Sequence, residues 1–125
     1  AEKFQAMVKL GLLNSRMKDF YDIWFLSQMF NFKGETLVEA IEKTFEKRIT
    51  PIPKEPTIFT PSFMRDENKQ AQWQGFINKT KLGDAPASFE NVIAGIKVFL
   101  QPVVASITDQ QTFRLIWAAS GPWST

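Results

Sequence analysis

The chain has 125 residues, of which 44% are hydrophobic and 14% aromatic, which is enough apolar material for one folded domain and too much for a disordered chain. It contains no cysteine and no histidine, which excludes disulfides, thiolate or imidazole metal sites and any Cys–His or Ser–His catalytic pair within it. Fifteen Lys and Arg residues against thirteen Asp and Glu leave a net charge of +2, an excess too small to indicate a nucleic-acid surface by itself.

The first third of the chain predicts two helices. Apolar residues recur at three- and four-residue spacings from Glu2 to Gly11, which indicates the first. The second runs from Arg16 to about Phe30, with Asn14 or Ser15 as its cap, and is apolar around nearly its whole circumference. Such a helix is expected to be buried on most sides and to lie at the centre of the domain.

A third helix and a proline-rich connector follow. Gly34 is expected to end the preceding unit, and Thr36–Glu39 fits a capping box that starts a helix running to about Arg48. Four prolines then make residues Ile49 to Pro61 an extended connector. Its apolar side chains are expected to pack against the core; the alternative is a domain boundary within the connector. These side chains are Ile52, Ile58 and Phe59.

The second half of the chain predicts two more helices. Asp66 can cap one that reaches about Lys79, and Ser88 can cap the most regular apolar helix of the sequence, from Phe89 to Ile107. The tail beyond it is apolar and irregular, and no alternating strand pattern longer than a few residues occurs. The predicted fold class is therefore all-α: a single helical domain over residues 1–125 with about five main helices, a Pro-rich connector and an irregular apolar C-terminal tail.

No segment reads as a signal peptide or a membrane span. The start at Ala1 lacks a basic and then apolar pattern, and the longest apolar stretch, from Phe89 to Ile107, is interrupted by Glu90 and Lys97. We therefore expect a cytoplasmic location and no membrane partner. Because the chain opens directly in a helical pattern without an initiator Met, we also expect it to be part of a longer protein.

One group of charged residues stands beside the apolar second helix. Asp19 and Asp22 are three apart, so both carboxylates lie near one helical face, together with Arg16 and Lys18. Paired carboxylates can hold a divalent cation, and a neighbouring Lys, such as Lys3, can meet a phosphate. Alternatively, the two acids are favoured by the helix dipole and simply pair with Arg16 and Lys18. Composition and spacing alone favour this second interpretation.

Two longer segments carry a family resemblance. Ala1–Ala6 (AEKFQA) and Asn14–Asp22 (NSRMKDFYD) are similar to the third and fourth motifs of the AbiEii/AbiGii toxin family. The similarity continues in shorter stretches along nearly the whole chain: Phe32–Leu37, Thr44–Arg48, Thr50–Pro53, Gln72–Trp73, Ser88–Phe89, Phe99–Val103 and Gly121–Trp123.

The resemblance implies a nucleotidyltransferase-like enzyme, the toxin of bacterial toxin–antitoxin and abortive-infection (phage-defence) systems, which uses Mg²⁺ and an NTP and in some members acts on tRNA. The N-terminal part of the family carries a Gly/Ser nucleotide motif and a D-x-D metal pair on a β-sheet. This sequence contains neither, so it resembles the mostly helical C-terminal portion. By position, the resemblance implies that Lys3 and Asp19 are catalytic, with Lys3 facing the triphosphate, and that Arg16, Lys18 and Asp22 support them.

Two functional hypotheses follow. In the first, the chain lends Lys3 and Asp19 to a cleft completed by a missing N-terminal nucleotidyltransferase domain, holds no metal or cofactor of its own and is inactive alone. In the alternative, it is a free-standing helical interaction module that docks an antitoxin or another partner through its apolar tail. The first helix, continued by Leu12 and Leu13, has more apolar residues than one buried stripe requires. We therefore expect the isolated chain to form a homodimer through this helix, near Lys3.

Overall fold

A computed structural model describes residues 1–11 and 16–125 of the protein and is mostly helical. The suggested caps Asn14 and Ser15, and the apolar Leu12 and Leu13, lie outside the described residues. The helices are α1 (Glu2–Leu10), α2 (Met17–Met29), α3 (Gly34–Lys47), α4 (Pro61–Met64), α5 (Glu67–Thr80) and α6 (Phe89–Thr108), with a 3-10 turn at Thr57–Phe59. The strands are β1 (Phe32–Lys33), β2 (Ile116–Trp117) and β3 (Trp123–Ser124).

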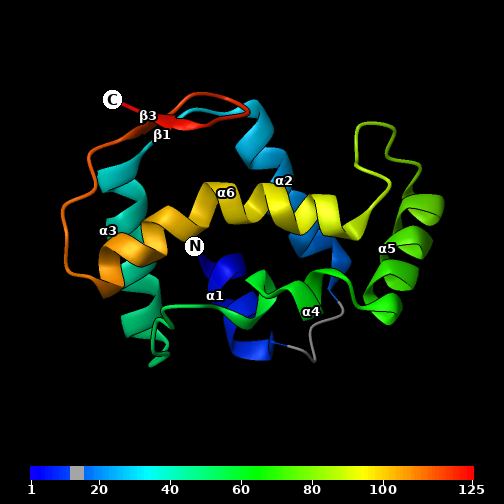
Figure 1. Ribbon diagram of the computed structural model, residues 1–125, viewed down its shortest axis with the longest axis horizontal. Coiled ribbons are helices and arrows are strands. Elements are labelled where there is room, and N and C mark those ends of the chain that lie inside the picture. Colours follow the sequence, from blue (N-terminus) through cyan, green and yellow to red (C-terminus); the bar gives the residue numbers. More distant parts are fainter. Residues whose placement is uncertain (12–15) are drawn as a thin grey trace.

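Helix α6 is the centre of the fold. Figure 1 shows it crossing the middle of the molecule, with α2 against it, α3 at one end and α5 at the other. Its apolar stripe is fully buried, as for Val92, Ile96 and Val103, because helices pack on it from several sides. The central position predicted for α2 is therefore wrong. The end of α2 leaves Met29 and Phe30 exposed, since no neighbouring element in the described part of the chain covers that face.

The predicted starts of α5 and α6 are confirmed by their caps. The Asp66 carboxylate accepts a hydrogen bond from the Lys69 backbone N–H at 3.0 Å, and the Ser88 hydroxyl accepts one from Asn91 N–H at 3.3 Å. Each bond satisfies an amide that the first helical turn leaves without a partner. Local side-chain chemistry is therefore sufficient to start both helices.

Helix α3 begins three residues earlier than the predicted capping box implies, and the capping box is wrong. Its first residue is Gly34, and the preceding Lys33 makes no side-chain cap. The Gly34 N–H instead donates to the carbonyl of Leu115 at 2.8 Å. A Cβ at position 34 would overlap the Phe113 ring and lie 2.8 Å from the Leu115 oxygen. The start of α3 is thus set by a contact with the C-terminal tail.

The connector after α3 packs into the core, as predicted. Ile58 and Phe59 are buried, and the ring of Phe59 stacks on Phe4 of α1 with 6.2 Å between centroids. The sequence pattern missed the short helix α4 that follows. Its N-cap is Thr60, whose hydroxyl accepts from Phe63 N–H at 3.4 Å. The connector and the helices before and after it therefore share one hydrophobic cluster.

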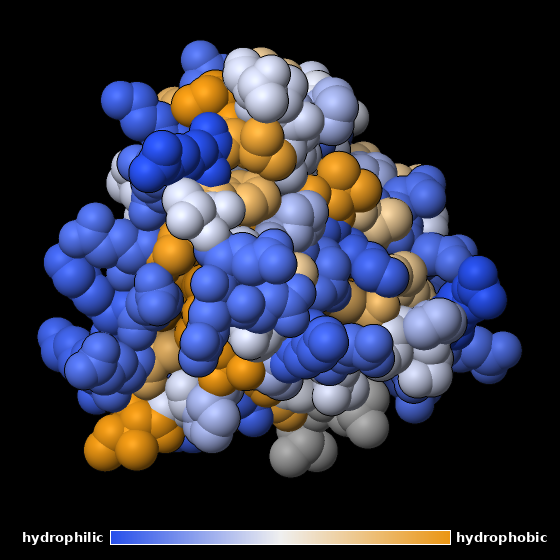
Figure 2. Space-filling view, turned by 60° about the vertical axis from the view of Figure 1, so that its left-hand side comes forward, coloured by the Kyte–Doolittle hydropathy of each residue, from blue (hydrophilic) through white to orange (hydrophobic). Residues whose placement is uncertain are grey.

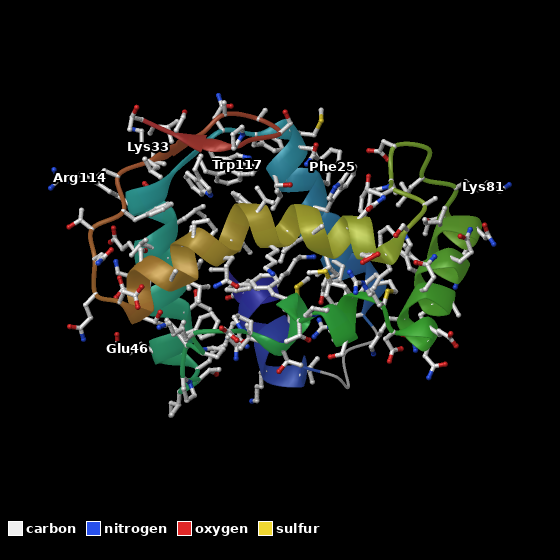
Figure 3. The ribbon with its side chains drawn as sticks, viewed as in Figure 1. Phe25, Lys33, Glu46, Lys81, Arg114 and Trp117 are labelled. Atoms are coloured by element: carbon white, nitrogen blue, oxygen red, sulfur yellow. The ribbon has the colours of Figure 1, made fainter. Side chains whose placement is uncertain are left out.

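The tail is ordered by a small sheet that the sequence did not predict. Strands β1, β2 and β3 pair antiparallel, with Phe32 opposite Trp117 and Trp117 opposite Trp123. The Trp117 side chain lies between the sheet and α6 (Figure 3), is 1% exposed and donates its indole N–H to the Ser27 carbonyl at 2.7 Å. Strands of two residues are too short to show alternation. The protein is mostly helical, and the tail is part of its core.

Helix α6 has 20 residues, and its most apolar 18-residue window has a mean hydropathy of 1.5, so it is long and apolar enough to cross a membrane by length and composition alone. The core helix of a globular domain can meet the same two criteria. Here Ile93, Ile96 and Val104 are fully buried inside the protein, so the hydrophobicity of α6 is explained by the packing of the core.

Candidate functional site

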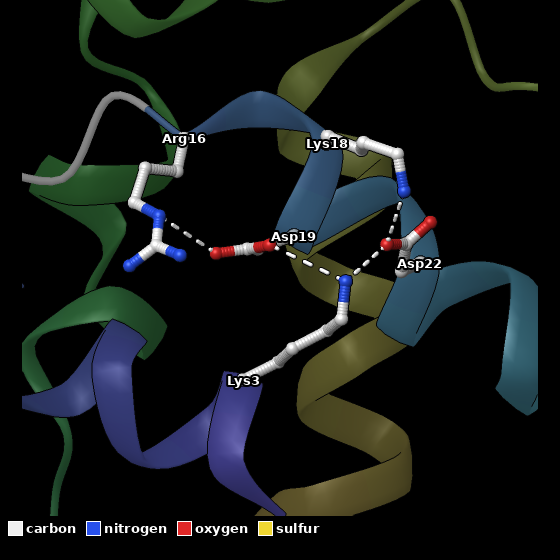
Figure 4. A network of polar contacts seen from close by, with 5 residues as sticks. All are labelled: Lys3, Arg16, Lys18, Asp19 and Asp22. Carbon is white, nitrogen blue, oxygen red and sulfur yellow. Dashed lines mark hydrogen bonds and ion pairs between the residues drawn. The ribbon is translucent and has the colours of Figure 1, made fainter.

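All five residues singled out in the sequence come together where α1 meets α2 (Figure 4). Lys3 lies in the first turn of α1, on the side facing α2. Arg16 directly precedes α2, and the first two turns of that helix carry the other three residues, Lys18, Asp19 and Asp22. The helices are fixed against each other by the core, in which Phe4, Met7 and Phe20 are buried. We call these five residues the charged cluster.

Lys3 is the centre of the charged cluster. Its ammonium donates a hydrogen bond to Asp22 Oδ2 and lies 3.4 Å from Asp19 Oδ1. The hydrogen bond to Asp22 raises the pKa of Lys3 above its ordinary value, with the charges of Asp22 and Asp19 adding to the effect. The side chain nevertheless remains 45% exposed. Lys3 is thus a firmly protonated cation that solvent can still reach.

The two carboxylates differ in their surroundings. Asp22 Oδ2 accepts from Lys18 Nζ at 2.9 Å as well as from Lys3. Burial raises the pKa of Asp22, but the hydrogen bonds from Lys3 and Lys18 outweigh burial and hold this pKa below its usual value. Asp19 is more deeply buried: its Oδ2 lies 3.0 Å from Arg16 Nε as an ion pair, without hydrogen-bond geometry. Asp19 is therefore a largely buried carboxylate that pairs with both Lys3 and Arg16.

The charged cluster presents positive charge to solvent. Three cations against two carboxylates leave a net charge of +1, and Arg16 and Lys18 are mostly exposed, whereas Asp19 and Asp22 are largely covered. Exposed ammonium and guanidinium groups are suited to hold a phosphate. The cluster does not fit a magnesium ion. Both acids already pair with cations, and no group of three metal-ligating side chains occurs among residues 1–11 and 16–125.

Sequence reasoning missed one acid at the border of the charged cluster. The Tyr21 hydroxyl donates to both carboxylate oxygens of Asp84, each at 3.1 Å. Burial raises the pKa of Tyr21, and the hydrogen bond to Asp84 raises it further. Asp84 lies in the loop between α5 and α6, 63 residues along the chain. Only the tertiary packing of that loop on α2 brings it here, and no sequence spacing signals the contact.

Comparison with known proteins gives one result. A family model described as nucleotidyl transferase AbiEii toxin, type IV toxin–antitoxin system, matches residues 1–95 of the chain. The matched region contains α1 to α5, the first part of α6 and all five residues of the charged cluster. No curated protein and no solved structure matches the chain.

Proposed function

Because the chain belongs to the AbiEii nucleotidyl transferase toxin family, we propose that it is the helical portion of a nucleotidyltransferase-like toxin. In this proposal, Lys3 and Asp19 line one side of a nucleotide-binding cleft. The other side, with the Gly/Ser motif and the D-x-D acids that this sequence lacks, belongs to an N-terminal portion of the protein. The chain alone is then inactive.

The observation that carries this proposal is the meeting of Lys3 and Asp19 across two helices, 3.4 Å apart. Phosphoryl transfer requires cations placed where negative charge accumulates on the phosphates. Lys3 would supply such a cation and bind a phosphate of the incoming NTP. Asp19, held from the other side by Arg16, would orient the Lys3 ammonium. Nucleotide binding would then require little rearrangement of the protein, because the Asp19 carboxylate is already held in place by Arg16 before the nucleotide binds.

Two further members of the charged cluster allow Lys3 to change partner. A phosphate that binds Lys3 has to compete with Asp22, which shares its Oδ2 between Lys3 and Lys18. When Lys3 turns to a phosphate, Lys18 would keep the Asp22 carboxylate paired. Mg²⁺, which the D-x-D acids of the N-terminal portion would hold, would neutralise further phosphate charge. Lys18 and Asp22 thus act as supports and do not contact the reacting atoms.

The family also points to partners. The type IV toxin–antitoxin description supports an antitoxin as the cognate partner of this protein. We propose tRNA as the acceptor of the transferred nucleotide and the cytoplasm as the place of action, in keeping with the resemblance of the motifs. The alternative of a free interaction module is weakened at one point. The tail that would be its most apolar docking segment is packed inside the protein, with Trp117 buried and Trp123 bonded to the Phe99 carbonyl.

The test uses the protein with its N-terminal portion. We expect Lys3→Ala and Asp19→Asn each to abolish growth inhibition and the Mg²⁺-dependent transfer of the labelled nucleoside monophosphate group from NTP to tRNA, with release of pyrophosphate. Lys43→Ala is the matched control, because it removes a surface Lys that also bonds a carboxylate, Glu39 at 2.7 Å, but lies on α3 outside the cluster. It is expected to leave activity unchanged. Thermal unfolding checks that every variant is folded.

Two outcomes would contradict the proposal. Full toxicity in both cluster variants would reduce Lys3 and Asp19 to a structural ion pair and favour the interaction module. Robust NTP turnover by the 125-residue chain alone, assayed with Mg²⁺ and tRNA, would show that the catalytic centre lies within this chain.

A further inference from the structure

A shallow groove shares no lining residue with the charged cluster. It has a volume of about 380 Å³ and lies between the end of α3, the end of α6 and the start of the connector. Phe45, Ile52 and Ile107 form its apolar lining, and Glu42 and Glu46 stand on its rim. Glu46 lies at the end of α3, beside the last turn of α6 (Figure 3). Figure 2 brings this side forward and shows hydrophobic atoms as a narrow strip and small patches between hydrophilic side chains.

The two rim glutamates belong to a longer acidic stripe on α3. Glu35, Glu39, Glu42 and Glu46 follow one another at spacings of four, three and four, which places all four on one side of the helix. The first two are paired within the protein: Glu35 with Arg114 at 3.1 Å and Glu39 with Lys43 at 2.7 Å. Nothing in residues 1–11 or 16–125 forms an ion pair with Glu42 or Glu46. Glu35 and Glu39, which lie away from the groove, are therefore neutralised by ion pairs, whereas Glu42 and Glu46 beside the groove are not.

The position of these two charges is unfavourable for the isolated helix. Like charges four residues apart repel each other. Glu46 is also the penultimate residue of α3, where the negative end of the helix dipole disfavours a carboxylate. A cation supplied from outside would relieve both effects. The charge pattern of the groove is thus complementary to a basic ligand.

A second feature beside the groove indicates that the ligand also has apolar groups. Ile49, between the groove residues Glu46 and Thr50, has a positive φ of 50° and a side chain that is 91% exposed. A β-branched residue rarely adopts this backbone conformation. Here it is held by hydrogen bonds from Ile49 N–H to the Glu46 carbonyl at 3.1 Å and from Thr50 N–H to the Phe45 carbonyl at 2.9 Å. The turn therefore presents an isoleucine to solvent next to the acidic rim.

We propose that this groove docks a basic, amphipathic segment of a partner protein. Arg or Lys heads of that segment meet Glu42 and Glu46, their aliphatic stems lie on Ile52 and Ile107, and an apolar neighbour packs on Ile49. This surface contains no residue of the charged cluster, so the inference does not depend on the proposed nucleotide cleft.

The test is the fluorescence anisotropy of a short fluorescein-labelled peptide of alternating Arg and Leu, titrated with the 125-residue chain at low salt and at about 150 mM salt. We expect Glu42→Gln/Glu46→Gln to weaken binding by about tenfold at low salt and to reduce its salt dependence. The matched control is Glu35→Gln/Glu39→Gln, which makes the same charge change on the same stripe outside the groove. It is expected to change affinity by less than about twofold, because those acids are already paired.

A third variant separates docking of a protein segment from binding of a free polycation. Ile49→Ser should lower the affinity for the peptide by about threefold and leave the salt dependence of binding unchanged, because it removes an apolar contact and no charge. Circular dichroism confirms the helix content of each variant. Equal losses in the two double variants, or no peptide binding at low salt, would overturn the proposal. Spermine that binds as tightly as the peptide, with no dependence on Ile49, would instead assign the groove to a free polyamine and would also overturn it.

Discussion

The charged cluster shows how far single residues could be assigned from the sequence. The three-residue spacing of Asp19 and Asp22 predicts their common face, and both the structural and the functional interpretation place Arg16 and Lys18 beside them. The contact of Lys3 with these acids could not be derived from spacing, because it depends on how α1 packs on α2. The family resemblance groups Lys3 with Asp19, and the structure brings them together. Their catalytic role stays a prediction.

The pKa shifts of the charged cluster predict how stability depends on pH. Asp22 has a lowered pKa in the folded state, so its contribution is present above about pH 4 and is lost as the pH falls through the folded pKa. Lys3 has a raised pKa, so its contribution is complete below about pH 10 and is lost as the pH rises through the folded pKa. Because Lys3 is 45% exposed, solvent screening limits its effect to under about 1 kcal/mol.

Thermal unfolding from acid to alkaline pH measures these contributions. We expect Asp22→Asn to flatten the acid side of the profile relative to the native protein, and Lys3→Met to flatten the alkaline side. Profiles that superimpose on that of the native protein would show that neither ion pair forms in solution.

At the scale of elements, the local sequence predicts the start of a helix correctly where the helix is capped by a nearby side chain. It does not predict the start where a distant segment of the chain determines it. Asp66 and Ser88 cap α5 and α6 as predicted. Helix α3 instead begins at Gly34, where the tail bonds to its first N–H. Helix α2 is apolar around nearly its whole circumference, as a central helix would be. Its end nevertheless leaves Met29 and Phe30 exposed, because no neighbouring element in the described part of the chain covers that face.

Two glycines test the distinction between local and distant effects. Gly34→Ala is expected to destabilise the protein, because the new methyl would overlap the Phe113 ring and crowd the Leu115 carbonyl. Gly75→Ala in α5 is the control, since nothing lies within 4 Å of the added atom. There the substitution should stabilise by about 0.5–1 kcal/mol through helix propensity. Chemical denaturation measures both. A neutral Gly34→Ala would mean that the tail moves away from α3 at little cost.

A large aromatic residue of α6 provides a second test at this scale. Phe99 packs against Phe32, Trp117 and Trp123, with ring centroids at 5.1, 4.9 and 6.0 Å. Phe99→Ala should therefore cost about 3–5 kcal/mol of unfolding free energy. Trp24→Ala should cost less, because Trp24 on α2 is only partly buried. An equal loss for both, measured by urea denaturation, would show that Trp24 contributes as much to the core as Phe99 and would contradict this prediction.

For the molecule as a whole, the family match and the folded unit have different limits. The match ends at residue 95, inside α6 (Phe89–Thr108). The remaining residues complete that helix and add strands β2 and β3, of which β2 carries the buried Trp117. The helical content was predictable because most helices carry clear apolar periodicity. The sheet was not, since two-residue strands leave no pattern and β1 pairs with β2, a strand more than eighty positions further along the chain, as in Phe32 with Trp117.

The exposed apolar surface of the molecule predicts that the chain self-associates through the end of α2, and not through the first helix as the sequence suggests. The sequence pointed to the first helix, but Phe4 and Met7 of α1 are buried in the core. Three of the large exposed apolar residues lie close together in sequence at the end of α2: Leu26, Met29 and Phe30 are 41%, 59% and 51% exposed. We expect a reversible, symmetric pair to form through this surface.

Light scattering across a concentration series measures this association. Met29→Ser/Phe30→Ser should shift the apparent mass toward the monomer. Leu10→Ser, which changes an exposed residue of α1, serves as the control and should leave the mass as it is. A native chain that stays monomeric at high concentration would contradict the prediction.

The packed tail also gives the protein an optical probe of its own. The indole rings of Trp117 and Trp123 lie 5.4 Å apart at 62° to each other, close enough for their electronic transitions to couple. Such coupling produces a circular dichroism signal that is separate from that of the helices. Release of the tail from α6 would remove this signal while the helical spectrum persisted, so a spectrometer can follow the two events in one sample without any label.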